Sequence, residues 1–123
     1  MAYSLSARSM KNLIGVHPAL VRVVRRAIQI SDVDFGVSEG VRTIERQRQL
    51  YEQQRSQTMN SYHLTGDAVD LFAWVDGDVS WGWDYYEEIA RAMDAAAEEL
   101  GVEIVWGGNW TSLRDGPHFQ RVR

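Results

Sequence analysis

The apolar positions after Pro18 recur every three or four residues, as they do along one face of an α-helix. These positions are Leu20, Val24, Ala27 and Ile28. Pro18 itself suits the first helical position, where a backbone N–H is not needed. The pattern predicts a helix that begins at Pro18, with His17 at its start. Residues 1–16 have no such period and are expected to form an irregular lead-in.

A second, shorter helix is predicted after Arg42. Thr43 can accept hydrogen bonds from the first free backbone N–H groups, and Glu45 in the first turn suits the positive end of the helix dipole. Leu50 and Tyr51 are the apolar positions expected to face the core.

The longest helix is predicted to begin at Asp84, which has capping-box spacing to Glu87, and to end at Gly101. Its expected core stripe consists of Ile89, Met93, Ala96, Ala97 and Leu100.

Alternating apolar and polar positions predict strands at 34–41, 68–75, 103–106 and 118–122. Asp76-Gly77 is typical of a tight hairpin turn, with Val79 and Trp81 on a returning strand. Residues 53–60 are polar and aperiodic, which predicts a loop. The order of elements predicts one α+β domain over residues 1–123, with a small, mostly antiparallel sheet and helices packed on one side.

Composition narrows the classes of function. The chain is 45% hydrophobic and 24% charged, which is ordinary for a globular domain. Its net charge of −4 argues against nucleic acid as a main partner. Arginines gather in the first half and acids after Asp67, a pattern that suits either solvated helix faces or a basic surface for an anionic polymer.

Two further absences limit the chemistry. The chain has no cysteine, which excludes disulfides, thiolate ligands and cysteine nucleophiles. No signal segment or run of membrane-spanning length is present in the sequence, so stable membrane insertion is not expected.

The stretch S-Y-H-L-T-G-D-A-V-D, at 61–70, carries two candidate metal ligands, His63 on a loop and Asp70 on a strand. A lone Asp on a half-buried strand face is costly unless it is paired or metal-bound. If the final strand pairs with this one, His118 can meet Asp70. Two imidazoles and one carboxylate suit catalytic Zn²⁺ and also Fe(II). The alternative is that both histidines are ordinary hydrogen-bonding residues.

Four other side chains are candidates for the same site. Asp115 lies before the tight turn Gly116-Pro117, which could bring its carboxylate over a metal as a general base or leave it an ordinary turn residue. Arg42 could bind a substrate carboxylate or carbonyl, or lie on the surface. Trp106 and Trp110 could line a cleft or seal the core. His17 is excluded as a ligand because it starts a helix.

These residues fall into sequence blocks that resemble zinc-dependent D-alanyl-D-alanine carboxypeptidases and, more closely, phage L-alanyl-D-glutamate endopeptidases that act as endolysins. The first block is S-x-H-x-x-G-x-A-x-D, at Ser61, His63, Gly66, Ala68 and Asp70. The others are W-G-G-N-W at 106–110, D-G-P-H-F at 115–119, and E-G-V-R-T with E-R-Q-x-x-L-Y between residues 39 and 51. The resemblance spans nearly the whole chain.

The resemblance implies a Hedgehog/D,D-peptidase-like fold with the zinc site at the sheet. It makes His63, Asp70 and His118 the zinc ligands and Asp115 the general base. Arg42 would orient the substrate and stabilise the transition state, and Ser61 would support the ligand loop or contact substrate. Trp106 and Trp110 complete the expected substrate-binding set.

The expected function is a zinc metallopeptidase that cleaves the L-Ala/D-Glu bond of peptidoglycan stem peptides. The alternatives are a D-alanyl-D-alanine carboxypeptidase or dipeptidase with the same metal site, an Fe(II) oxygenase, and a non-catalytic wall-binding module. A phage lysin of this kind is expected to be a monomer without a separate wall-binding module. It would accumulate in the host cytoplasm and reach the cell wall in the periplasm through a separate membrane pore. A cytoplasmic enzyme of peptide recycling would look similar in sequence.

Overall fold

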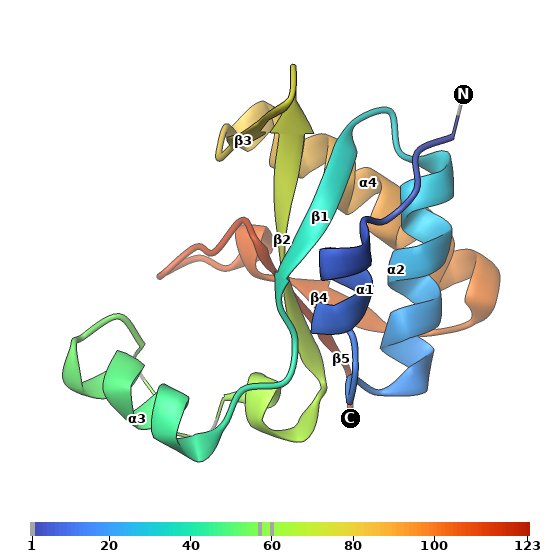
Figure 1. The fold of residues 1–123 in the computed structure, drawn as a ribbon. Coiled ribbons are helices and arrows are strands. Elements are labelled where there is room, and N and C mark those ends of the chain that lie inside the picture. The colour runs from blue at the N-terminus through green and yellow to red at the C-terminus, as the bar shows by residue number, and fades with distance from the viewer. Residues whose placement is uncertain (1, 57, 60) are drawn as a thin grey trace.

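The computed structural model describes residues 2–56, 58–59 and 61–123, and the fold is α+β, as predicted (Figure 1). The α-helices are α1 (Ala7–Asn12), α2 (Pro18–Ile30), α3 (Ile44–Glu52) and α4 (Trp83–Leu100). The strands are β1 (Asp34–Glu39), β2 (Ala68–Val75), β3 (Asp78–Ser80), β4 (Ile104–Trp106) and β5 (His118–Arg121). Two short 3₁₀ helices, η1 (Tyr62–Thr65) and η2 (Gly107–Asn109), lie next to strands β2 and β4.

Strand β2 is the centre of an antiparallel sheet with the order β1-β2-β5-β4. One edge of β2 pairs with β1. Its other edge pairs with β5 over residues 68–70 and with the short β3 over residues 73–75. Between the segments that pair with those two partners, the carbonyl of Leu71 accepts a hydrogen bond from the hydroxyl of Tyr86 at 3.3 Å.

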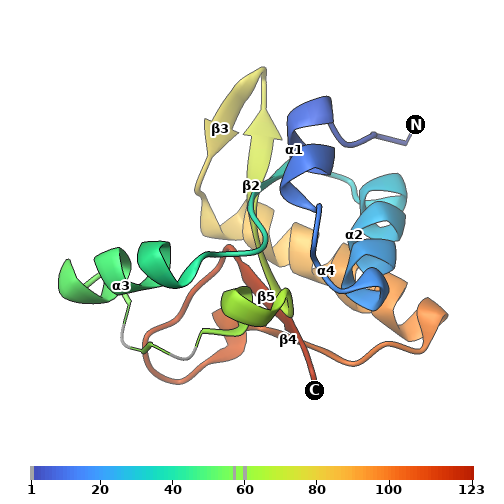
Figure 2. The same ribbon diagram turned by 60° about the horizontal axis from the view of Figure 1, so that its bottom comes forward.

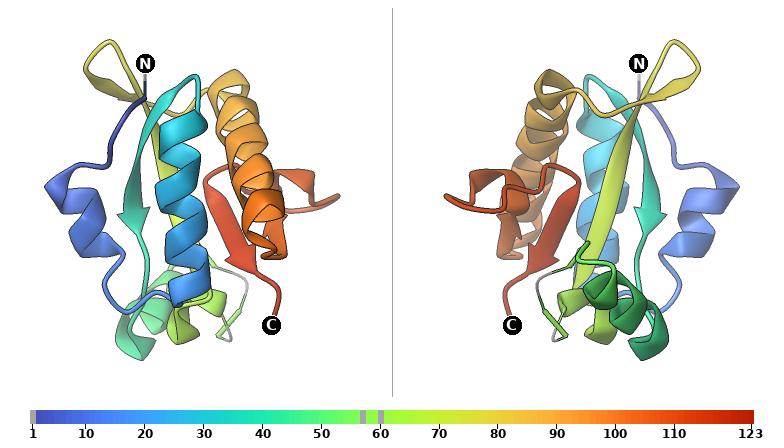
Figure 3. Two further views of the ribbon diagram at one scale, coloured as in Figure 1. Left: turned by 90° about the vertical axis from the view of Figure 1, so that its right-hand side faces the viewer. Right: turned by 90° about the vertical axis from the view of Figure 1, so that its left-hand side faces the viewer.

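The helices do not all lie on one side of the sheet. Helices α2 and α4 cover one face, α1 lies along the β1 edge, and α3 stands off the opposite face (Figures 1 and 3). The buried face of β2 carries Val69, Leu71 and Ala73, all 0% exposed, which pack with the apolar stripes of α2 and α4. The prediction of helices on a single side is therefore wrong for α3, whose polar sequence leaves it beside the open face (Figure 2).

Most predicted boundaries are confirmed within a few residues, with physical reasons for the exceptions. The stretch predicted to be irregular contains α1, which Ser6 caps by accepting from the backbone N–H of Ser9. Helix α4 begins one residue earlier than predicted, after Gly82, and no side chain caps it, so the expected capping box does not form. Strand β1 ends at Glu39, because a bulge before that residue turns the chain away.

Two residues expected in the core are exposed. Tyr51 is 48% exposed, and the buried positions of α3 are Leu50 and Gln47, which lie one turn apart. Leu100, in the last turn of α4, is 38% exposed.

The turns after β2 and α4 form as predicted. Asp76 and Gly77 both have positive φ, at 53° and 82°, which is the combination that a two-residue type I′ hairpin requires. Gly101 ends α4 with φ of 70°. The predicted loop at 53–60 has no helix or strand among its described residues, and positions 57 and 60 lie outside them. In the described part of the chain, no helix combines the length and apolar character needed to cross a bilayer.

Asp67 ties the start of β2 to the C-terminal strand. Its carboxylate accepts from Arg121 at 2.9 Å, from Arg123 at 3.1 Å and from Thr65 at 2.7 Å. Burial alone would raise the pKa of Asp67, but these hydrogen bonds outweigh that effect and lower the pKa below its ordinary value. The contacts hold the segment that carries η1 against β5.

We predict that Asp67→Asn lowers the free energy of unfolding by about 2 kcal/mol at pH 7, because two charge-assisted hydrogen bonds are weakened. A depressed pKa stabilises the fold above the unfolded value of about 4, and this stabilisation is lost as pH falls through the folded-state pKa. Urea unfolding between pH 7 and pH 3.5 measures the difference, with exposed Asp32→Asn as control. A difference from wild type that does not shrink in acid would contradict this account.

Candidate metal centre

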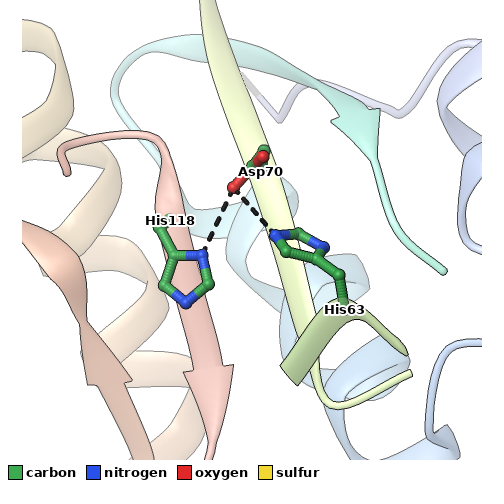
Figure 4. A group of neighbouring side chains, drawn as sticks. All are labelled: His63, Asp70 and His118. Atoms are coloured by element: carbon green, nitrogen blue, oxygen red, sulfur yellow. Dashed lines mark ion pairs between the residues drawn. The ribbon is translucent and has the colours of Figure 1, made fainter. Parts of the chain in front are cut away.

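The register between β2 and β5 brings two of the candidate ligands together. Asp70 and His118 are direct cross-strand partners, so their side chains leave the same face of the sheet. Nδ1 of His118 lies 3.4 Å from Oδ1 of Asp70. The predicted meeting of these two residues through strand pairing is confirmed (Figure 4).

The third candidate comes from η1, the turn immediately before β2. Ser61 caps this turn by accepting from the backbone N–H of His63 at 3.2 Å. Gly66 ends it with φ of 74°, and a Cβ there would lie 2.6 Å from the carbonyl oxygen of Gly15, so no other residue fits without a shift. Nε2 of His63 consequently lies 3.3 Å from Oδ1 of Asp70, opposite His118 (Figure 4).

Hydrogen bonds behind the two imidazoles set which ring nitrogens face Asp70. Nδ1 of His63 lies 2.8 Å from the carbonyl oxygen of Gly40, and Nε2 of His118 lies 2.8 Å from Oε1 of Gln120. Both partners are acceptors, so a neutral ring that donates to its partner directs its unprotonated nitrogen toward Asp70.

Three electron-pair donors therefore converge on one point. The ligand atoms of His63, Asp70 and His118 all lie within 4.8 Å of one another. Nε2 of His63 and Oδ1 of Asp70 are buried without a hydrogen-bond partner. Unpaired buried acceptors are costly, and a cation between them would satisfy all three at once. The donor set thus fits a divalent metal such as zinc, with positions left for other ligands.

The charges at the centre also favour the binding of a cation. Burial would raise the pKa of Asp70, but contacts with the two imidazoles hold that pKa well below its ordinary value. Burial would lower the pKa of His118, yet the adjacent Asp70 carboxylate raises it. The group attracts positive charge, whether a proton or a metal ion.

Arg42 reaches the centre from the turn before α3. Its guanidinium is held by both oxygens of Glu39, at 2.7 and 2.9 Å, and by Oε1 of Gln47 at 2.7 Å. Nη2 lies 3.6 Å from Oδ2 of Asp70, and the side chain is only 9% exposed. Arg42 is therefore a fixed positive charge beside the centre and not a surface arginine.

Asp115 lies on the loop before β5 and lines the same cleft as the three candidate ligands. Gly107 makes this approach possible, because a Cβ there would lie 2.5 Å from the backbone oxygen of Asp115. Burial raises the pKa of the Asp115 carboxyl, and the negative charge of Asp70 raises it further. A half-buried carboxyl with a raised pKa, close to a cation site, is a better proton acceptor than an exposed carboxylate.

These residues lie in an open cleft of about 760 Å³ between α3 and the loop that precedes β5. Ser61, Trp110 and Asp115 line it together with the three candidate ligands, and the ring of Trp110 lies 5.3 Å from that of His118. Trp106 does not line it. That ring stacks on Phe119 in the core and donates to the carbonyl of Gly116 at 2.7 Å, so the expectation that Trp106 contacts substrate is corrected.

Three residues that support the site were missed in the sequence. Gln47 is fully buried and also donates to Ser56, so it joins Arg42 to the wall of the cleft. Gln47 lies three residues before Leu50, and this helical spacing indicates that both side chains face the core. Gln120 lies two residues after His118 on the same strand, and this spacing indicates that the two side chains share a face. Nothing in the sequence indicates that the carbonyl of Gly40 would orient His63.

Comparisons with known proteins agree with this geometry. A family model described as phage L-alanyl-D-glutamate peptidase matches residues 1–121. The chain is 30% identical to the L-alanyl-D-glutamate peptidase of Escherichia phage T5 over 119 residues, which cover 94% of this chain and 87% of that protein. It is 33% identical to the L-alanyl-D-glutamate peptidase of Listeria phage A118, over 96% of this chain and 41% of that protein.

A solved structure is also similar. The crystal structure of the Serratia marcescens L-Ala D-Glu endopeptidase ChiX matches with a TM-score of 0.92 and 52% sequence identity, over 99% of this chain and 90% of that one.

We predict that a divalent metal stabilises the fold through His63, Asp70 and His118. Zinc at about 100 times its dissociation constant adds about 2.7 kcal/mol, which raises the unfolding midpoint by roughly 5–15 °C. His63→Ala and His118→Ala should abolish the increase in a thermal scan with and without zinc. His17→Ala, which alters the third histidine at the start of α2, should keep it. If zinc still raises the unfolding midpoint of both variants, the metal binds at other residues.

Proposed function

Because the chain belongs to the family of phage L-alanyl-D-glutamate peptidases, we propose that it is a zinc-dependent endopeptidase that cleaves the L-Ala/D-Glu bond of peptidoglycan stem peptides. The observation that carries the proposal is the convergence of three buried donors with Asp115 and Arg42 at their side. Similarity to the Serratia marcescens L-Ala D-Glu endopeptidase supports the bond specificity.

We assign His63, Asp70 and His118 as the residues that hold the zinc ion. Two imidazole nitrogens and one carboxylate leave positions for water and substrate, which is the arrangement of catalytic zinc sites. When bound there, zinc supplies a Lewis acid for the scissile carbonyl and lowers the pKa of a bound water toward about 7. Gly40 and Gln120 orient the two imidazoles from behind.

Asp115 is the proposed general base. Its raised pKa and its position on the cleft wall allow the carboxylate to take a proton from the attacking water and give it to the leaving amine. Arg42 is proposed to bind the substrate oxygen that gains negative charge. Glu39 and Gln47 already hold the guanidinium in place, so little reorganisation is needed when that charge develops.

The cleft suits an acidic peptide. Arg46, Arg55 and Arg114 line it in addition to Arg42, and stem peptides carry free carboxylates beyond the scissile bond. We propose that Ser61 and Trp110 complete the substrate-binding surface. Three arginines of the first half of the chain thus lie where they can bind an anionic ligand at α3, while Arg26 pairs with Glu99 on the helical face.

We further propose a role in phage-type host lysis. The enzyme would act as a monomer, remain in the host cytoplasm until a separate membrane pore releases it, and then cleave the wall from the periplasm. The kinship with two phage peptidases supports this route.

Asp115→Asn tests the base. We predict that the variant binds zinc with wild-type stoichiometry but loses a factor of about 10²–10⁴ in hydrolysis of purified peptidoglycan, because proton transfer is lost while the metal ligands remain. Dye release from labelled sacculi and metal analysis of the same sample measure both quantities. Asp32→Asn makes the same chemical change at an exposed site and should be fully active. Wild-type lysis by Asp115→Asn would remove Asp115 from the mechanism.

The bond cleaved separates the proposal from its alternative, a D-alanyl-D-alanine carboxypeptidase or dipeptidase with the same metal site. We predict new amino-terminal D-Glu and no free D-alanine after digestion of peptidoglycan. Amino-terminal labelling with amino-acid analysis of the products measures this. Release of D-alanine without new D-Glu termini would establish the alternative.

A further inference from the structure

A row of aromatic rings continues from the metal centre along the open face of the sheet. Alternation on β2 places Asp70, Phe72 and Trp74 on one face, at two-residue steps. The ring centroid of Phe72 lies 5.4 Å from that of Trp74 and 6.4 Å from that of Trp81, which follows β3. We call Phe72, Trp74 and Trp81 the aromatic platform.

The platform is not part of the core. Trp74 is 37% exposed and Trp81 is 60% exposed, whereas the neighbouring β2 residues that face the helices are fully buried. Figure 3 (right) shows β2 crossing this open face from η1, beside α3, to the β2–β3 hairpin at the far end. Exposed aromatic residues that gather on one face are typical of a binding surface.

Polar groups beside the platform narrow the class of ligand. Trp74 borders a hollow of about 350 Å³ that Tyr3, Asp34 and Asp76 also line. Sugar rings present C–H groups on their faces and hydroxyl groups on their rims. The C–H groups pack against the negative face of an aromatic ring, and the hydroxyls donate to carboxylate and phenol oxygens.

The chemistry of the substrate limits how far its sugar lies from the scissile bond, a step that rests on the proposed function. In peptidoglycan only one alanine and a lactyl group separate the L-Ala/D-Glu bond from the amino-sugar strand. Fully extended, that link spans about 7 Å. Along β2, Phe72 lies about 7 Å and Trp74 about 13 Å beyond Asp70. A link directed along β2 brings the first sugar to Phe72, and the next sugar of the strand then lies toward Trp74.

We propose that the aromatic platform binds the glycan strand, a polymer of N-acetylated amino sugars, while the stem peptide occupies the arginine-lined cleft. The scissile bond then lies at the junction of the two surfaces. A membrane surface is the other ligand that exposed tryptophans suit, but Asp34 and Asp76 line the hollow beside Trp74 and would repel anionic lipid.

Kinetics on two substrates test the platform. Trp74→Ala, Trp81→Ala and the double variant are compared with wild type on a glycan-linked muropeptide and on the same stem peptide without sugar. We predict that the double variant raises KM at least tenfold on the glycan-linked substrate and changes hydrolysis of the free peptide less than twofold. Trp74→Tyr and Trp81→Tyr keep an aromatic face and should recover most of the affinity. Tyr51→Ala, which removes an exposed ring from α3, is the control.

Failure of the proposed peptidase function and failure of glycan binding by the platform give different results. If wild type cleaves neither substrate at the L-Ala/D-Glu bond, the proposed function fails. If wild type cleaves both with the same KM, or if the variants lose activity equally on both substrates, the platform does not bind glycan.

Direct binding is measured with the wild-type protein, which avoids any effect of substitution on folding. Peptide-free glycan strands are titrated against the five tryptophan indole N–H signals. We predict shifts of the Trp74 and Trp81 signals and little change at the buried Trp106. Shifts produced by vesicles of anionic phospholipid but not by glycan would overturn the inference in favour of a membrane surface, and no shift with either would overturn it outright.

Discussion

The site depends on one pairing, that of Asp70 with His118 across two antiparallel strands. A shift of this register by one residue would send the His118 side chain to the helical face and remove it from the centre. Two sets of contacts around β5 oppose such a shift in register. Trp106 and Phe119 stack in the core beneath β5, and Asp67 holds Arg121 at the strand's end. The packed side of the sheet thereby fixes the geometry of the open side.

The metal centre holds electron-pair donors close together in the fold, which is unfavourable in free energy. Two imidazole nitrogens and a carboxylate oxygen face one another, and the hydrogen bonds to Gly40 and Gln120 prevent either ring from turning away. Such a cluster costs free energy unless a cation joins it. Arg42 lies within 3.6 Å of Asp70 but is committed to Glu39 and Gln47, so it tempers the negative charge without filling the position between the ligands.

The sequence was informative wherever a single periodic element carried the signal. Period-two alternation on β2 placed Asp70 on an otherwise apolar strand, and the Asp76-Gly77 turn and the Gly101 stop both formed. Contacts between segments that are distant in the sequence were harder to predict. The carbonyl of Gly40 meets His63 just after the bulge near the end of β1, and the role of Trp106 as core follows from its stacking on Phe119. The short helix α1 was missed because six residues carry too little periodicity.

The proposed reaction requires that the protein bind a polymer, orient one bond and move a proton. The open face divides these tasks along β2, with charge at the η1 end and aromatic rings at the hairpin end. The most direct test of the central claim is a crystal of the zinc-loaded protein measured at the zinc absorption edge. We predict one anomalous peak about 2.0–2.2 Å from Nε2 of His63, Nδ1 of His118 and a carboxylate oxygen of Asp70. No peak among these three side chains, or a peak on other residues, would contradict the account.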